Sequence, residues 1–247
     1  MNLSPDSVIV GSILGYPVSM TLVGAWIVIA PLAFFCGLAT RRFTPGFKMT
    51  RTQNMLESLV VFIRDQIEGV LGRPADKYLP LIGSLLIFIL AANWSMLLPI
   101  PFETPDGVEW FAPTTSSLST TAALALVVMA STFWFGIKAR GARNYFGKYL
   151  KPVFLMLPLN ILSEISSSFA LAIRLYGNIM SMVVLYVIIL ALSPLMFPAI
   201  LNVFGLLAGT IQPYIFAILA LVYIGSAMGE PTERERRELV QLKQRRI

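Results

Sequence analysis

The sequence predicts an all-α polytopic membrane protein with about five transmembrane helices and one interfacial amphipathic helix. Of the 247 residues, 56% are hydrophobic and 13% are charged, and the mean hydropathy is +0.75. A soluble domain usually carries about 25% charged residues, so this chain has too few charges to cover a water-facing surface. Apolar stretches of about 20 residues, the length that crosses a bilayer, recur along it. We therefore expect residues 1–247 to form a single integral membrane domain.

The expected elements follow one another with few interruptions. The predicted crossings are residues 16–40, 78–99, 116–137, 153–197 and 201–228. Residues 47–72 mix apolar and charged side chains at helical spacing, which favours a helix lying at the membrane interface over a crossing. Residues 230–247 are rich in basic and acidic side chains and form a helix-prone tail. We expect this tail beside the membrane surface, where it can touch anionic lipid.

The charges of the loops predict the orientation. Segments 41–51 and 138–151 are basic, as is the tail, whereas loop 100–115 contains three carboxylates and no Lys or Arg. Basic loops remain on the cytoplasmic side. We therefore expect the amino terminus outside and the carboxyl terminus in the cytoplasm, an arrangement that five crossings satisfy at every loop.

Several chemistries are excluded by residue counts. The single cysteine, Cys36, cannot form an intrachain disulfide, and the chain has no histidine, which removes the commonest metal ligand and a Ser-His-Asp triad. No GxxxxGK[ST] phosphate loop is present. The net charge of +6 lies in loops and the tail. We therefore expect no metal, no cofactor and no nucleic-acid partner.

Arg174 is a charged residue within a segment that is expected to cross the membrane. It lies far from both ends of the apolar segment 153–197, whose only carboxylate is Glu164. A charge at this depth costs about 2.5–3.5 kcal/mol on insertion scales, and arginine does not lose its proton. Ten residues are about 15 Å of helical rise, so the two cannot pair along one straight helix. Arg174 must face water, a carboxylate or a polar cavity.

Small and polar side chains recur every three or four residues around Arg174 and form one stripe of the helix. The stripe comprises Asn160, Ser163, Ser167, Ala170, Arg174, Asn178 and Ser181. Such a stripe lets another helix approach closely. Packing within the chain is one explanation, but an apolar contact would leave the arginine's donors unpaired. No other carboxylate lies in the crossings, so we expect a carboxylate from another polypeptide.

Five motifs, in order, resemble subunit a of the rotary F-type ATP synthases. They are PLIGSLLIFILAANWSMLLPIP, FAPTTSSLSTTAALAL, GIKARG, LAIRLYGNI and IQPYIFAILALVYIGSA, and together they cover most of the chain. The resemblance implies that Arg174 is the stator arginine facing the ring of c subunits. It also implies that Asn178 and Gln212 are polar positions beside it, and that the last two spans form a long tilted hairpin against the ring.

The resemblance also implies a function. The chain would be the non-catalytic stator subunit whose two half-channels load and unload H⁺ or Na⁺ on the c-ring carboxylates, with no ATP chemistry of its own. Its partners would be the c ring, b-type peripheral stalk subunits, the rest of the F1F0 complex and the bilayer of an energy-transducing inner or plasma membrane. An ion-coupled secondary transporter is the alternative; it would show internal repeats, and none matches segment 153–197.

The chain departs from the family pattern where titratable groups are common. Val183 stands nine residues after the arginine, Gly205 seven before the glutamine, and Thr115–Ser117 where the family often has an acidic residue. Glu164 remains, either lining a channel or hydrogen-bonded structurally to serines. These losses favour water-filled channels or sodium transport, as in the divergent N-type branch that the chain resembles, and leave H⁺ and Na⁺ both open.

Overall fold

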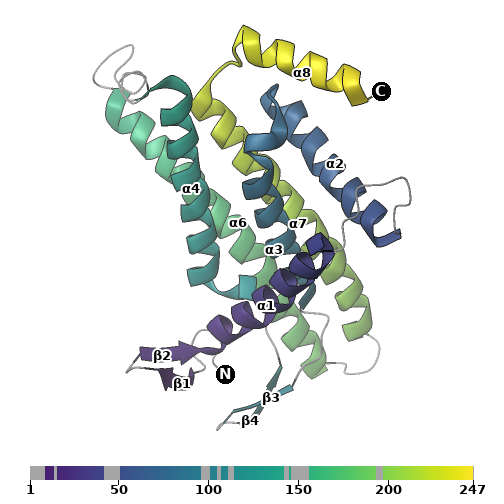
Figure 1. The fold of residues 1–247 in the computed structure, drawn as a ribbon. Coiled ribbons are helices and arrows are strands. Elements are labelled where there is room, and N and C mark those ends of the chain that lie inside the picture. Colours follow the sequence, from purple (N-terminus) through teal and green to yellow (C-terminus); the bar gives the residue numbers. More distant parts are fainter. Residues whose placement is uncertain are drawn as a thin grey trace. The chain divides into compact units, whose positions relative to one another are not determined.

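The computed structural model describes residues 9–13, 16–41, 51–95, 101–104, 107–110, 114–141, 145, 156–192 and 197–246. Among these residues it is dominated by seven α-helices (Figure 1). They are α1 (Met20–Arg41), α2 (Arg51–Leu71), α3 (Leu79–Trp94), α4 (Leu118–Arg140), α6 (Met156–Leu192), α7 (Phe197–Met228) and α8 (Glu233–Arg246). Two 3₁₀ turns, η2 (Ala75–Lys77) and η4 (Thr114–Ser116), precede α3 and α4.

Three helical segments in the described residues are long and apolar enough to cross a membrane. They are Leu118–Arg140, Leu162–Leu185 and Val203–Met228. Gly24–Phe34 and Leu79–Trp94 are apolar but shorter. The membrane character of the chain is thus borne out in three segments, and the expected total of five crossings remains a prediction. The basic connections 42–50, 142–144 and 146–155 lie outside the described residues.

Two short β-hairpins depart from the all-α expectation. β1 (Ile9–Ile13) pairs antiparallel with β2 (Tyr16–Ser19), and β3 (Pro101–Thr104) pairs antiparallel with β4 (Gly107–Trp110). Each has at most five residues per strand, and the second falls within the loop 100–115. An isolated two-stranded hairpin is only marginally stable. Strands this short also carry little pattern, so a search for apolar segments of about 20 residues does not detect them.

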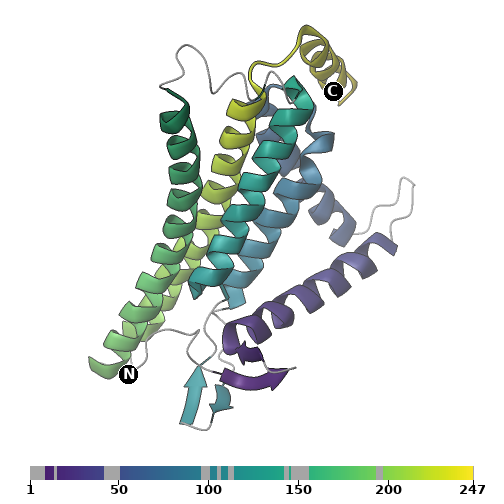
Figure 2. The ribbon, with the colours of Figure 1, turned by 90° about the vertical axis from the view of Figure 1, so that its left-hand side faces the viewer.

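The chain forms two compact units, which share four helices. The first comprises Met1–Arg42, Leu86–Ala123 and Ala172–Tyr214, and the second comprises Phe43–Leu85, Leu124–Leu171 and Ile215–Ile247. Helices α3, α4, α6 and α7 each contribute one part to either unit; Figure 2 shows these helices lengthwise. The buried core of the first unit includes Ile89, Ala92, Leu175 and Ile179. That of the second includes Ile67, Ile82, Val128, Phe216 and Leu221.

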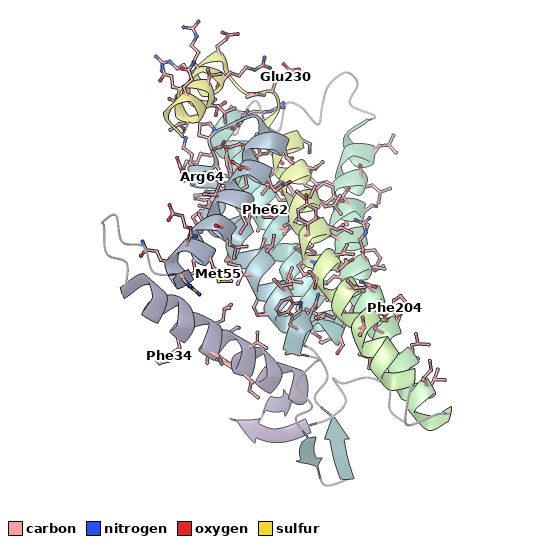
Figure 3. All side chains as sticks on the ribbon, turned by 90° about the vertical axis from the view of Figure 1, so that its right-hand side faces the viewer. Phe34, Met55, Phe62, Arg64, Phe204 and Glu230 are labelled. Atoms are coloured by element: carbon pink, nitrogen blue, oxygen red, sulfur yellow. The ribbon has the colours of Figure 1, made fainter. Side chains whose placement is uncertain are left out.

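Helix α2 has one buried side and one exposed apolar edge in the second unit. Ile63 and Ile67, one turn apart, are buried. Met55 and Phe62, seven residues apart and so on one side of the helix, are 74% and 47% exposed (Figure 3). An exposed apolar edge on a charged helix is what an interfacial position requires.

Two arginines of the second unit hold the end of α7. Arg140 Nε donates to the Met228 carbonyl at 2.9 Å, and Arg73 Nη2 donates to the carbonyls of Gly229 and Glu230 at 3.1 and 2.9 Å. The last carbonyls of a helix have no partner within it and carry partial negative charge, so both cations stabilise this end. Gly229 has a φ of +75°, the left-handed conformation that ends helices at glycine.

Helix α8 begins with one half of a capping box, the bond from the N-cap residue's N–H to the carboxylate three residues later. The backbone N–H and the hydroxyl of Thr232 both donate to Glu235 Oε2, at 2.9 and 2.6 Å, and Arg73 Nε lies 3.4 Å from the same oxygen. Burial acts to raise the pKa of Glu235, but the bonds from Thr232 and the charges of Arg73 and Lys77 outweigh it and lower that pKa. The carboxylate therefore couples the tail helix to the buried Arg73.

This coupling predicts a pH-dependent tail. Because the folded pKa of Glu235 is lowered, its contribution is complete above the unfolded value of 4.5 and is lost as pH falls through the folded value. We expect Glu235→Gln to lower the local stability of α8 by about 1 kcal/mol at neutral pH. Hydrogen-exchange protection of the α8 amides measures this.

The matched control is Glu238→Gln in the same helix, since Glu238 is exposed and bonds to none of the described residues. Equal protection in both variants at neutral pH would contradict the coupling.

Candidate functional site

Arg174 lies in the part of α6 that belongs to the first unit, on the open side of the helix. Leu175 and Ile179, four residues apart, are 0% and 4% exposed and form the packed side. Arg174 itself is exposed. None of the described residues gives it a hydrogen bond or an ion pair. The structure therefore leaves a permanent positive charge on α6 without a partner in the described part of the chain.

The stripe predicted around Arg174 is largely open. Ser163, Ala170 and Ser181 are exposed, while Ser167 is half-buried. The Ser167 hydroxyl donates to the Ser163 carbonyl at 2.8 Å, the bond to the preceding turn that serine commonly makes inside a helix. The stripe thus presents small side chains, and its hydroxyl at position 167 is already satisfied within the helix. Asn160 has no described side chain.

The structure brings Asn178 and Gln212 together in the first unit. Asn178 Nδ2 donates to Gln212 Oε1 at 3.5 Å. Asn178 follows Arg174 by four residues, so both lie on one side of α6. Gln212 is 5% exposed, and its Nε2 has no hydrogen-bond partner in the described structure. A buried amide with a free donor is costly, so this group indicates a site that needs polarity.

Four polar side chains that sequence reasoning did not pair lie in the same unit. Asn93 Nδ2 donates to the Gly209 carbonyl at 3.0 Å, and Thr115 Oγ1 donates to Asn93 Oδ1 at 2.7 Å. Trp94 Nε1 donates to Thr210 Oγ1 at 3.0 Å. The signal was available for Asn93, because a lone amide in an apolar span must find a partner. Thr115, Ser116 and Ser117 are also buried. Neutral hydroxyls thus occupy the positions at which related sequences often have an acidic residue.

Glu164 belongs to the second unit and is half-buried. Its Oε1 accepts a hydrogen bond from the Tyr145 hydroxyl at 3.3 Å. Tyr145 is 1% exposed and packs edge-on against Phe133, with ring centroids 6.2 Å apart. Ser168 donates to the backbone carbonyl of Glu164 at 3.2 Å, a different acceptor from the carboxylate. Tyr145 was missed because it sits in a basic connection where no periodicity marks it.

Two buried amides of the first unit should respond oppositely to the same substitution. Gln212→Leu removes the unpartnered Nε2 together with the acceptor of a long 3.5 Å bond from the half-buried Asn178, so thermal stability in detergent should stay equal or rise by about 1 kcal/mol. Asn93→Leu strands the Gly209 carbonyl and the Thr115 hydroxyl, so stability should fall by about 1–3 kcal/mol. Unfolding of the purified chain measures both. A larger loss for Gln212→Leu than for Asn93→Leu would contradict this account of the site.

Comparisons with known proteins add to this geometry. A family described as "ATP synthase A chain" matches residues 21–225. The chain is 41% identical over 227 residues to ATP synthase subunit a 2 of Acaryochloris marina, covering 92% of this chain and 93% of that one. It is 43% identical to ATP synthase subunit a 1 of Chlorobaculum parvum (92% and 96% covered) and 42% identical to ATP synthase subunit a of Albidiferax ferrireducens (92% and 94%).

Proposed function

Because the chain belongs to the ATP synthase A chain family, we propose that Arg174 is the charge that separates two ion half-channels facing the rotor. The chain is a stator ion-channel subunit of the F0 membrane sector. Ions that pass such a stator load and unload carboxylates on the c-subunit ring, and the flow drives rotation. The single observation that supports Arg174 in this role is its exposed guanidinium without a partner in the described chain.

The role follows from the physics of the two charges. A rotor carboxylate must be neutralised by an ion before it can face lipid. When it reaches Arg174, the permanent cation attracts the ionised form and displaces the ion. The same charge repels a free cation, so no ion leaks directly from one half-channel to the other. Lysine is a poorer choice because burial can remove its proton.

The remaining polar groups divide between the two units. Asn178 and Gln212 supply neutral donors and acceptors beside Arg174. Val183 and Gly205 offer no proton-relay group, which supports water-filled paths and the N-type branch. Glu164, with its Tyr145 bond, is the titratable candidate for the entrance or exit of one half-channel. The rotor's own ion site decides between H⁺ and Na⁺.

The same proposal covers the assembly. The small side chains at 163, 167, 170 and 181 let a c-subunit helix approach α6 closely. The b-type stalk and the F1 sector complete the complex. The chain crosses an energy-transducing membrane five times, with α2 at the interface, the amino terminus outside and α8 in the cytoplasm. The basic connections and the exposed Met55–Phe62 edge support this placement.

Arg174→Ala should abolish coupled ATP synthesis and ATP-driven ion pumping while the complex still assembles, because Arg174 is the only Lys or Arg in the apolar segment 153–197. Pumping should fall at least about tenfold, an effect of the size expected for a lost charge interaction. Vesicles containing the whole complex measure it, with assembly checked by the amount of each subunit. Arg234→Ala is the matched control, an exposed arginine of α8. Normal coupling in Arg174→Ala would overturn the proposal.

Glu164→Gln tests the second titratable group. If the carboxylate lines a half-channel, the variant should slow ion flux severalfold and shift its pH or sodium dependence. Tyr145→Phe removes the bond to this carboxylate but keeps the carboxylate itself. It should therefore shift the pH or sodium dependence of the flux less than Glu164→Gln does. Flux in Glu164→Gln that is unchanged across pH and sodium would reduce Glu164 to a packing residue.

A further inference from the structure

A proline interrupts the hydrogen bonds of α7 beside the site. Pro213 lies inside this helix, four residues after Gly209. Proline has no N–H, so the helical bond from residue 213 to the Gly209 carbonyl cannot form. The segment Val203–Met228 is apolar and long enough to cross a membrane, where a carbonyl freed by proline must be satisfied by a neighbouring helix, a side chain or an ordered water. The Gly209 carbonyl therefore requires another donor.

Asn93 of α3 supplies that donor. Its Nδ2 lies 3.0 Å from the Gly209 oxygen, and the side chain is 6% exposed. Thr115 donates to the other end of the same amide at 2.7 Å, which turns the NH₂ group toward the carbonyl because only the amide oxygen can accept. A Cβ on residue 209 would lie 3.3 Å from Asn93 Cβ, so glycine at 209 permits this close approach.

The replaced bond spans the turn of α7 that carries Gln212. Gln212 stands directly before Pro213, and its Oε1 accepts from Asn178 of α6. Trp94, the next residue of α3, adds a second bond to Thr210 in the same turn. The direction in which Gln212 points thus depends on α3 as well as on α7.

We propose that Asn93 is a positioning residue for ion translocation. It substitutes for the backbone donor missing at Pro213 and so holds Gln212 beside Asn178, one turn from Arg174. The inference rests on the proposed role of these residues in ion passage. Asn93 touches neither the ion nor the rotor; it acts through the Gly209 carbonyl.

Pro213→Ala distinguishes a positioning role of Asn93 from direct contact between Asn93 and the ion. Alanine restores the backbone N–H that bonds to the Gly209 carbonyl, so the Asn93 bond is no longer needed. The complete complex is reconstituted in vesicles as four forms: the natural protein, Asn93→Leu, Pro213→Ala and the double variant. ATP-driven ion uptake is measured per unit of ATPase activity, together with its dependence on pH and sodium.

Asn93→Leu should lower coupled uptake about tenfold and shift its ion dependence when Pro213 is present. In the Pro213→Ala background the same substitution should cost less than about threefold. A difference of this size lies within the range measured for residues that share one hydrogen bond. Equal losses in both backgrounds would overturn the proposal and make Asn93 a group that contacts the ion.

Ser95→Ala is the matched control. Ser95 is also buried at 7% exposure, but among the described residues its hydroxyl bonds only to the Ala92 carbonyl of the preceding turn, at 2.6 Å. Its effect should be the same in both backgrounds. A dependence of the Ser95→Ala effect on residue 213 as large as that of Asn93→Leu would also overturn the proposal, because the coupling would then not belong to the Asn93 bond.

Assembly separates the remaining outcomes. If the complex with Asn93→Leu does not assemble, recovery of assembly on adding Pro213→Ala supports the proposal. If neither Asn93→Leu nor Asn93→Ala assembles, with Pro213 or with Ala at that position, the proposal is contradicted. The proposed function fails separately. Normal pumping in Arg174→Ala would end the gating role and leave the Asn93–Pro213 coupling standing, whereas a lost coupling with an inactive Arg174→Ala would end only the positioning role.

Discussion

A guanidinium that cannot be neutralised, on a helix whose only other charged residue is Glu164, is the constraint on which the rest of this site depends. Arginine keeps its proton, and the described part of the chain offers Arg174 neither a carboxylate nor a carbonyl. Leu175 and Ile179 pack on the other side of α6 and so keep the arginine on the open side. The stripe beside it consists of side chains too small to cover the charge. In the function proposed above, a rotor carboxylate that passes α6 is the partner that meets this need once in each step.

A second constraint acts on the backbone of α7. An apolar environment tolerates few unpaired carbonyls, and α7 has two places where the helix itself leaves them. At Pro213 the side chain of Asn93 supplies the missing bond. At the end of the helix Arg140 donates to the Met228 carbonyl, and Arg73 donates to the Gly229 carbonyl directly after it. Side chains from outside α7 thus bond its backbone in both compact units, and in our proposal the Asn93 bond positions Gln212.

The features that could be predicted from the sequence are those that depend on a single segment of the chain. Arg174 and its stripe followed from helical periodicity and the cost of a buried charge, because these depend on one segment alone. Asn178 was part of that stripe, but its role beside the arginine, and Gln212 altogether, emerged only through the family resemblance, since nothing local distinguishes a functional amide from a structural one. The Asn93 bond and the Tyr145–Glu164 pair join residues far apart in the chain, so no periodicity reveals them. Pro213 did carry a signal, since a proline in an apolar helix leaves a carbonyl that needs a donor.

The most direct test of the central claim is the structure of the assembled complex by electron cryomicroscopy, with the stator subunit seated against its rotor. The account predicts that Arg174 is the cation nearest to the ionised rotor carboxylate, within about 4 Å or through one bridging water. It also predicts that the stripe from Ser163 to Ser181 faces the rotor helix. An Arg174 side chain paired with a carboxylate of its own chain, with another face of α6 against the ring, would contradict it.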